Sequence, residues 1–224
     1  MHPELFLQDF CPYCQRVRIV LLHKNIPHQA IQIGPSNRPP WFAEVSPSGT
    51  VPALRDGALR IFDSSVITEY LNDISGGDML PADPGQRAMC RSWINHSGNC
   101  QGLFSRLVLA ADETEFSAVR VQLIDSLEKM EQGPLSREIP GLAGERLSLV
   151  DVAMAPLFTR LAHLETLQAV LPNMGLERVK GWSTRLLNDP AVLASIPENF
   201  PELFQRFLTA KAPRGFLLNR GGPD

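Results

Sequence analysis

The first part of the chain alternates between short apolar runs and a segment with a helical repeat of apolar positions. Residues 5–7 are a compact apolar run typical of a buried strand, and residues 28–33 alternate polar and apolar side chains. Between them, apolar residues from Tyr13 to Leu21 share one face of a helix that begins at Pro12. A strand, a helix and a strand of this length predict two parallel strands joined by a right-handed crossover.

Four further elements follow in this part of the chain. Residues 41–45 predict a short helix, and residues 51–54 and 59–62 predict a hairpin with an Asp-Gly turn. Asp63 then caps a helix that runs through Leu71. The predicted order is β-α-β-α-β-β-α, which is an α+β fold.

The pattern beyond residue 84 is helical almost throughout. Residues 149–161 are apolar on nearly every side, which predicts a central buried helix. The helices are predicted at residues 86–111, 113–132, 149–164, 175–187 and 203–210. The predicted organisation is an α+β domain at 1–75, a linker at 76–84, an all-helical domain at 85–212 and a flexible tail at 213–224.

Composition and charge argue against several classes of protein. The chain has 224 residues, 44% hydrophobic and 20% charged, as expected of a globular protein with one or two domains. A net charge of −3 argues against a nucleic-acid partner, and no apolar run is long enough to suggest a membrane span. The N-terminal segment lacks the pattern of a secretory signal, and four cysteines do not suggest a disulfide scaffold. We therefore expect a cytoplasmic protein with reduced thiols.

The stretch FCPYCQRV places two thiols at the start of the first predicted helix. Free N–H groups and the positive end of the helix dipole stabilise a thiolate at Cys11, so Cys11 is the predicted nucleophile. Cys14 lies about one turn further on and is at most a resolving thiol. Arg16 and Arg18 either add positive potential or face water. The alternative that this pair is half of a zinc site lacks two further ligands at zinc-like spacing, so no metal is expected.

Two further features are weak evidence of a ligand-binding site when each is taken alone. In GTVPAL, Pro52 opens a strand, and a cis bond after Val51 would turn the Val51 backbone groups outward to pair with an extended peptide. Asp63 and Ser64 form either a plain helix cap or a cradle for a ligand carboxylate and ammonium. Cys90 and Cys100 are predicted to be buried, inert thiols.

Taken together, these stretches of sequence indicate a family more specifically than any one of them does. FCPYCQRVRIVLLHKNIPHQ, NRPPWF, SPSGTVPAL and FDSSVITEYL, in this order, resemble the cytosolic glutathione transferases, and most of all the cysteine-dependent, omega-like branch. The resemblance is strong over the N-terminal domain and weaker beyond it, where SLVD matches a buried helix start in which Ser148 and Asp151 cap each other. It implies a thioredoxin-like domain that binds glutathione, an all-helical domain that forms the second-substrate pocket, and a homodimer.

The resemblance also implies roles for individual residues. Cys11 takes the position of the cysteine that forms a mixed disulfide with glutathione. Val51, before the cis-proline Pro52, would pair its backbone with the cysteinyl part of glutathione, and Asp63 and Ser64 would hold the γ-glutamyl end.

Two positions depart from the omega-like pattern. Arg38 falls where such members carry a lysine near the glycyl carboxylate, and arginine can serve a carboxylate there. Cys14 makes the active site C-P-Y-C, the glutaredoxin form, which leaves open a dithiol cycle with an internal disulfide.

The expected activity is glutathione-dependent thiol transfer or reduction of a small electrophilic or disulfide substrate, with dehydroascorbate among the candidates. The alternatives are a specialised cysteine-type transferase acting in reductive dehalogenation, quinone reduction or ether cleavage, and a non-catalytic regulator on the same fold.

Overall fold

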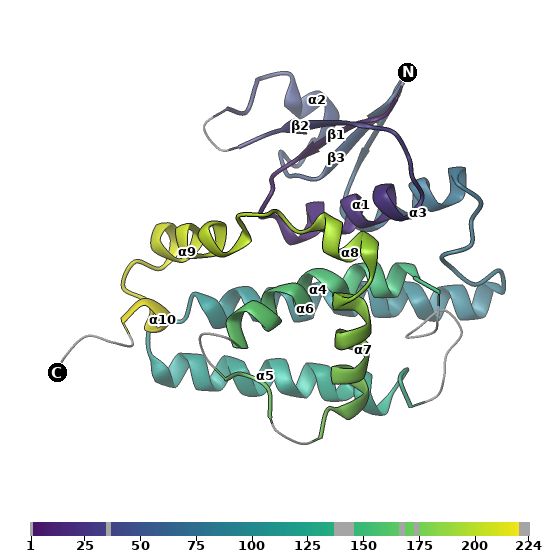
Figure 1. Ribbon diagram of the computed structural model, residues 1–224. Helices are drawn as coiled ribbons and strands as arrows, with labels where there is room; N and C mark the ends of the chain where they lie inside the picture. The colour runs from purple at the N-terminus through teal and green to yellow at the C-terminus, as the bar shows by residue number, and fades with distance from the viewer. Residues whose placement is uncertain (1, 35–36, 137–145, 166–168, 173–174, 220–224) are drawn as a thin grey trace.

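The computed structural model describes residues 2–34, 37–136, 146–165, 169–172 and 175–219. Figure 1 shows a small sheet with its helices at one end of the molecule and a larger group of helices at the other. None of the helices in these residues is long and apolar enough to cross a bilayer.

Four strands form one mixed sheet in the order β2-β1-β3-β4. The central strand β1 pairs in parallel with β2 and antiparallel with β3, and β3 pairs antiparallel with β4. The strands are β1 (Glu4–Leu7), β2 (Gln29–Gln32), β3 (Ala53–Asp56) and β4 (Leu59–Phe62). The interspersed helices are α1 (Pro12–His23), α2 (Phe42–Val45) and α3 (Ser64–Ile74). The predicted β-α-β-α-β-β-α order is confirmed.

The alternation of side chains along β1 buries both faces of the sheet. Leu5 and Leu7 join the main core beneath α1 and α3, whereas Phe6 joins a second cluster with Phe42 of α2. The helices α1 and α3 therefore lie between the sheet and the helical domain, and α2 covers the other side (Figure 1).

The rest of the described chain is helical, as predicted. The helices are α4 (Pro84–Val108), α5 (Glu113–Gln132), α6 (Leu149–Glu165), α7 (Glu177–Leu187), α8 (Pro190–Ser195), α9 (Phe200–Lys211) and α10 (Phe216–Asn219). Helix α6 is buried along most of its length and packs against α1, α4 and α7, which confirms the predicted central helix.

Two short helices were not predicted. Asp189 caps α8 and Pro190 occupies its first turn, but the six residues of this helix are too few to show a helical repeat of apolar positions. Within the predicted tail at 213–224, α10 is anchored where the Phe216 N–H donates to the Ala110 carbonyl at 2.9 Å. The Phe216 ring also lies 4.9 Å from the Phe116 ring. Residues 220–224 lie outside the described residues.

Candidate functional site

Cys11 is the N-cap of α1, with an extended backbone that points its sulfur at the free N–H groups of the first turn. The Cys14 backbone N–H donates a hydrogen bond to the Cys11 Sγ at 3.4 Å. The same sulfur lies 3.9 Å from the Val51 carbonyl oxygen, which brings the thiol beside the loop that precedes β3. All the cysteines are free thiols, and Cys11 is the one that is not fully buried.

The surroundings of Cys11 favour its thiolate. The Cys14 thiol donates a hydrogen bond to the Cys11 sulfur, and this contact, together with the backbone N–H groups of Cys14 and Tyr13 and the charge of Arg160, lowers the pKa of Cys11 to about 7 against the opposing effect of burial. Free cysteine has a pKa of about 8.5. A large fraction of Cys11 is therefore ionised near neutral pH.

Cys14 has the opposite character. Its side chain is fully buried, and its sulfur accepts a hydrogen bond from the Gln8 backbone N–H at 3.5 Å. Burial, the hydrogen bond that it donates to Cys11 and the negative charge there raise its pKa well above the usual value. Burial likewise raises the pKa of Cys90 and Cys100, which fits inert thiols.

The loop before β3 has the predicted backbone. The Val51-Pro52 peptide bond is cis, and β3 begins after it at Ala53. Val51 and Pro52 line a cleft next to Cys11.

Asp63 and Ser64 stand at the start of α3, on the same cleft. Asp63 is a true N-cap, because its carboxylate accepts hydrogen bonds from the Ser65 N–H at 2.8 Å and from the Ser65 hydroxyl. Its φ of 73° is unusual for a residue with a side chain, a strain that concentrates at functional sites. Ser64 is buried and faces the cleft.

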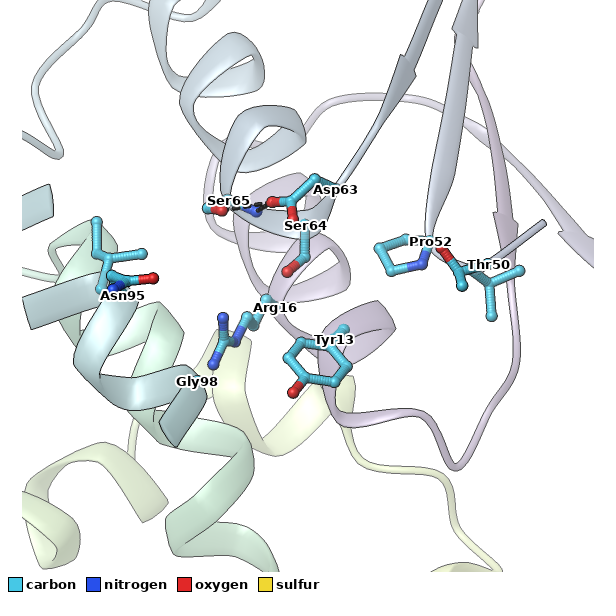
Figure 2. A pocket seen from close by; sticks show the side chains of 11 residues that line it. Tyr13, Arg16, Thr50, Pro52, Asp63, Ser64, Ser65, Asn95 and Gly98 are labelled. Carbon is cyan, nitrogen blue, oxygen red and sulfur yellow. Dashed lines mark hydrogen bonds between the residues drawn. The ribbon is translucent and has the colours of Figure 1, made fainter. Parts of the chain in front are cut away.

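The cleft has a volume of about 400 Å³ and lies between the two domains. Figure 2 shows the start of α3 above it, Thr50 and Pro52 on one side, and Asn95 and Gly98 of α4 on the other. The side chains of Tyr13 and Arg16 lie between these walls. A site with polar groups from both domains suits a small, charged ligand.

Arg16 is the buried charge of this cleft. Its residue is 5% exposed, its Nη2 donates to the Ser97 Oγ at 3.0 Å, and its guanidinium lies 5.0 Å from the centre of the Tyr13 ring. In the described part of the chain its Nε has no hydrogen-bond partner, and no carboxylate forms an ion pair with it. The cleft thus contains a positive charge and a free donor for an anionic group.

Comparison with known proteins identifies the family of this chain. Residues 10–74 match the family model of the glutathione S-transferase N-terminal domain. Glutathione S-transferase omega-1 of Sus scrofa is 32% identical over 193 residues, which span 85% of this chain and 79% of the relative. The chain belongs to the glutathione transferase family.

Further proteins similar to this glutathione transferase belong to the same family. Glutathione S-transferase DHAR2 of Arabidopsis thaliana is 29% identical over 93% of this chain and 87% of its own length. The crystal structure of glutathione transferase Omega 3C from Trametes versicolor matches with a TM-score of 0.79 at 25% identity, over 95% of this chain and 93% of that chain. The predicted omega-like character is confirmed, as is the fold of a thioredoxin-like domain joined to a helical one.

The structure brings most of the predicted site residues of this glutathione transferase together, around the cleft. Arg38 lies apart from them: it is exposed, and its Nη1 is 3.3 Å from where a Cβ on Gly49 would stand, so it borders the loop leading to Val51. The sequence left open whether Arg16 adds positive potential or faces water, and it did not predict Tyr13 as a lining residue, although their i, i+3 spacing on α1 places both on one helix face. It also missed Asn95 and Arg160, whose proximity depends on the packing of the helical domain.

Proposed function

We propose that this transferase carries out glutathione-dependent thiol transfer and reduction, with Cys11 as the nucleophile. The observation that carries the proposal is the position of the Cys11 sulfur, capping α1 beside the Val51 carbonyl, in surroundings that lower its pKa to about 7. Disulfide exchange is fastest when the attacking thiol has a pKa near the ambient pH. The omega-class relatives support the same activity.

The reaction proceeds by two thiol-disulfide exchanges. The Cys11 thiolate attacks the glutathionyl sulfur of a mixed disulfide, forming a Cys11-glutathione disulfide while the other thiolate leaves and takes up a proton. A second glutathione thiolate then attacks the glutathionyl sulfur of that adduct. This step releases oxidised glutathione and regenerates the Cys11 thiolate.

We propose one orientation for glutathione in the cleft. Its cysteinyl backbone pairs with the backbone of Val51, which places its sulfur next to Cys11. Its γ-glutamyl end lies at the start of α3, where Ser64 binds the α-carboxylate and Asp63 binds the ammonium group. Arg16 supplies the positive charge opposite that carboxylate.

Arg38 is the proposed partner of the glycyl carboxylate. Its Nη1 lies 3.3 Å from where a Cβ on Gly49 would stand, so it borders the loop that leads to Val51. Because Arg38 is exposed, we expect its contribution to binding to be smaller than that of Arg16.

The second substrate is a small disulfide or electrophile, and dehydroascorbate is a further candidate. Phe10 precedes Cys11, and its ring lies 5.4 Å from that of Phe200 and 5.3 Å from that of Phe207 on α9. These rings offer an apolar wall on the side of Cys11 that faces the helical domain.

Intact mass after incubation with oxidised glutathione tests the proposal. We expect one glutathione adduct on wild-type protein, none on Cys11→Ser, and an unchanged adduct on the control Cys90→Ser, since Cys90 is buried. An internal disulfide between Cys11 and Cys14 would instead indicate a dithiol cycle. No adduct and no turnover on mixed disulfides would favour the regulator, and turnover only on halogenated, quinone or ether substrates would favour the specialised transferase.

Assembly and location complete the proposal. We propose a homodimer, which fits the exposed apolar side chains of Phe62 on β4 and Val66 at the start of α3, and light scattering checks its mass. We also propose the cytoplasm, where the free cysteines stay reduced, and fractionation of cells checks this location.

A further inference from the structure

Arg160 connects the helical domain to the loop that carries the nucleophile. Its residue on α6 is 3% exposed. Its Nη2 donates to the Phe10 carbonyl at 2.6 Å, and Phe10 immediately precedes Cys11. Its Nη1 donates to the Gln15 Oε1 at 2.7 Å and to the Pro156 carbonyl at 2.9 Å. The guanidinium therefore fixes both sides of the Cys11 turn, since Gln15 lies in the first turns of α1.

The charge of Arg160 is not balanced by these contacts. All three acceptors are neutral, and among the described residues no carboxylate forms an ion pair with Arg160. The guanidinium lies against the rings of Phe10 and Phe200, at 5.2 and 5.5 Å from their centres, which exclude water. Arg185, by contrast, has a counter-ion, because it forms an ion pair with the buried carboxylate of Asp151. A buried charge without a counter-ion is costly unless a negative group lies nearby.

We propose that Arg160 is a positioning residue for Cys11, which holds the Phe10 carbonyl and has the Cys11 thiolate as its counter-ion. Burial lowers the pKa of Arg160 to about 10, while the nearby Cys11 acts in the opposite direction, so the guanidinium stays charged at neutral pH. Each charge thereby offsets part of the cost of burying the other. The reactivity of a thiol in the thioredoxin-like domain then depends on a residue of the helical domain.

Other charged or titratable groups lie on the elements that pack around this pair. Arg16 on α1 faces the cleft and Cys14 donates to Cys11, whereas His163 on α6 lies with its ring against Phe200 and Phe204. Tyr13 and Arg18 also lie on α1, Asp63 caps α3, and Glu202, Arg206 and Lys211 on α9 are exposed. Arg160 is the charge in contact with the residue next to Cys11.

The experiment measures the rate at which iodoacetamide alkylates Cys11 as a function of pH, together with the melting temperature. Arg160→Met removes the charge, Arg160→Gln removes it but keeps a donor for the Phe10 carbonyl, and Arg160→Lys keeps the charge. The control is Arg120→Gln on α5, whose guanidinium also donates to a backbone carbonyl, that of Val170.

We expect both neutral variants to raise the pH midpoint of alkylation by about one unit, which lowers the rate at pH 7 about fivefold. Arg160→Lys should stay within about 0.3 unit of wild type, and Arg120→Gln should not move the midpoint. If Arg160→Met does not fold, Arg160→Gln decides the question alone. Folded neutral variants with the wild-type midpoint would overturn the inference, even if their melting temperatures fell.

The inference rests on the proposed role of Cys11, and the same experiment separates the two. Alkylation reports the thiol without glutathione or turnover. A wild-type midpoint near 7 with unmoved variants defeats the role of Arg160 alone. A wild-type Cys11 that iodoacetamide does not modify defeats the proposed nucleophile itself.

Discussion

Cys14 donates its backbone N–H to the Cys11 sulfur at 3.4 Å, and the two thiols of this pair have opposite properties. Cys11 is partly accessible with a pKa of about 7, whereas Cys14 is fully buried with its pKa raised well above the ordinary value. The thiol hydrogen bond between them is the main cause of the lowered pKa of Cys11, because it favours the anion there, whereas burial is the main cause of the raised pKa of Cys14 and the same hydrogen bond adds to it. The arrangement suits Cys14 as a donor that stabilises the attacking thiolate.

Replacing Cys14 distinguishes a donor from a resolving thiol. Cys14→Ala removes the donor and should raise the pKa of Cys11 by about one unit, whereas Cys14→Ser keeps an O–H donor and should leave it near the wild-type value. Ultraviolet absorbance of the thiolate during a pH titration measures the pKa of Cys11 in both variants. We expect Cys14→Ser to keep most of the thiol-transfer activity.

A resolving role gives a different pattern. Serine and alanine both lack the sulfur, so a dithiol cycle would lose turnover equally in the two variants. Equal and complete loss of activity would show that Cys14 takes part in the covalent chemistry.

The pH dependence of the wild-type enzyme follows from the lowered pKa of Cys11. The thiolate is the reactive form, so the rate rises with pH through the pKa and levels off above it. With a pKa of about 7, alkylation by iodoacetamide should be half-maximal near neutral pH and close to its plateau by about pH 8. Cys11→Ser provides the background rate. A midpoint near that of free cysteine, about 8.5, is incompatible with the hydrogen bonds described at Cys11.

The fold was largely predictable, because it follows from local patterns that the tertiary structure reinforces. The apolar run at 5–7 and the Asp-Gly turn each specify one element, and β1 and the β3–β4 hairpin appear where they indicate. Helix α8 was not predicted, because its six residues are too few to show a helical repeat of apolar positions. The start of α9 at Phe200 was placed too late for a similar reason, since a proline in the first turn weakens the apolar repeat there.

The residues of the site were predictable only where a single short segment of sequence determines their position. Cys11 sits at a helix start that the sequence itself encodes, and Ser64 follows a capping residue. Arg160 is 149 positions from Cys11, and its role depends on how α6 packs against α1. Arg16 had two open interpretations, and its burial by α4 through Ser97 decides between them. Contacts between distant segments leave no periodic signal in a single sequence.

Arg16 should contribute mainly to glutathione binding. Arg16→Gln removes the positive charge opposite the proposed α-carboxylate, and the loss of a charge-assisted hydrogen bond should raise the Kd for glutathione about tenfold or more. Calorimetric titration with glutathione measures this, and the melting temperature checks that the variant is folded. Ser97→Ala is the matched control, because it removes the side chain that orients Arg16 but keeps the charge, and its effect should be smaller. An unchanged Kd in folded Arg16→Gln would remove Arg16 from the binding site.

The stability of α6, which carries Arg160, depends on Asp151. Its fully buried carboxylate accepts hydrogen bonds from the Ser148 N–H at 2.8 Å and the Ser148 Oγ at 2.7 Å, which confirms the predicted mutual cap. The other oxygen accepts from the Trp182 Nε1 at 2.6 Å and the Arg185 Nη2 at 2.5 Å. One carboxylate thus joins the start of α6 to α7.

Asp151→Ala leaves Trp182 and Arg185 without their acceptor and should lower the free energy of unfolding by about 3–5 kcal/mol. Ser148→Ala loses only the cap and should cost about 1 kcal/mol. Urea denaturation followed by tryptophan fluorescence compares the two variants. Because Asp151 does not line the cleft, alkylation of Cys11 in the remaining folded protein should keep its midpoint near pH 7. A loss in Asp151→Ala no greater than that in Ser148→Ala would mean that the contacts to α7 add nothing to stability.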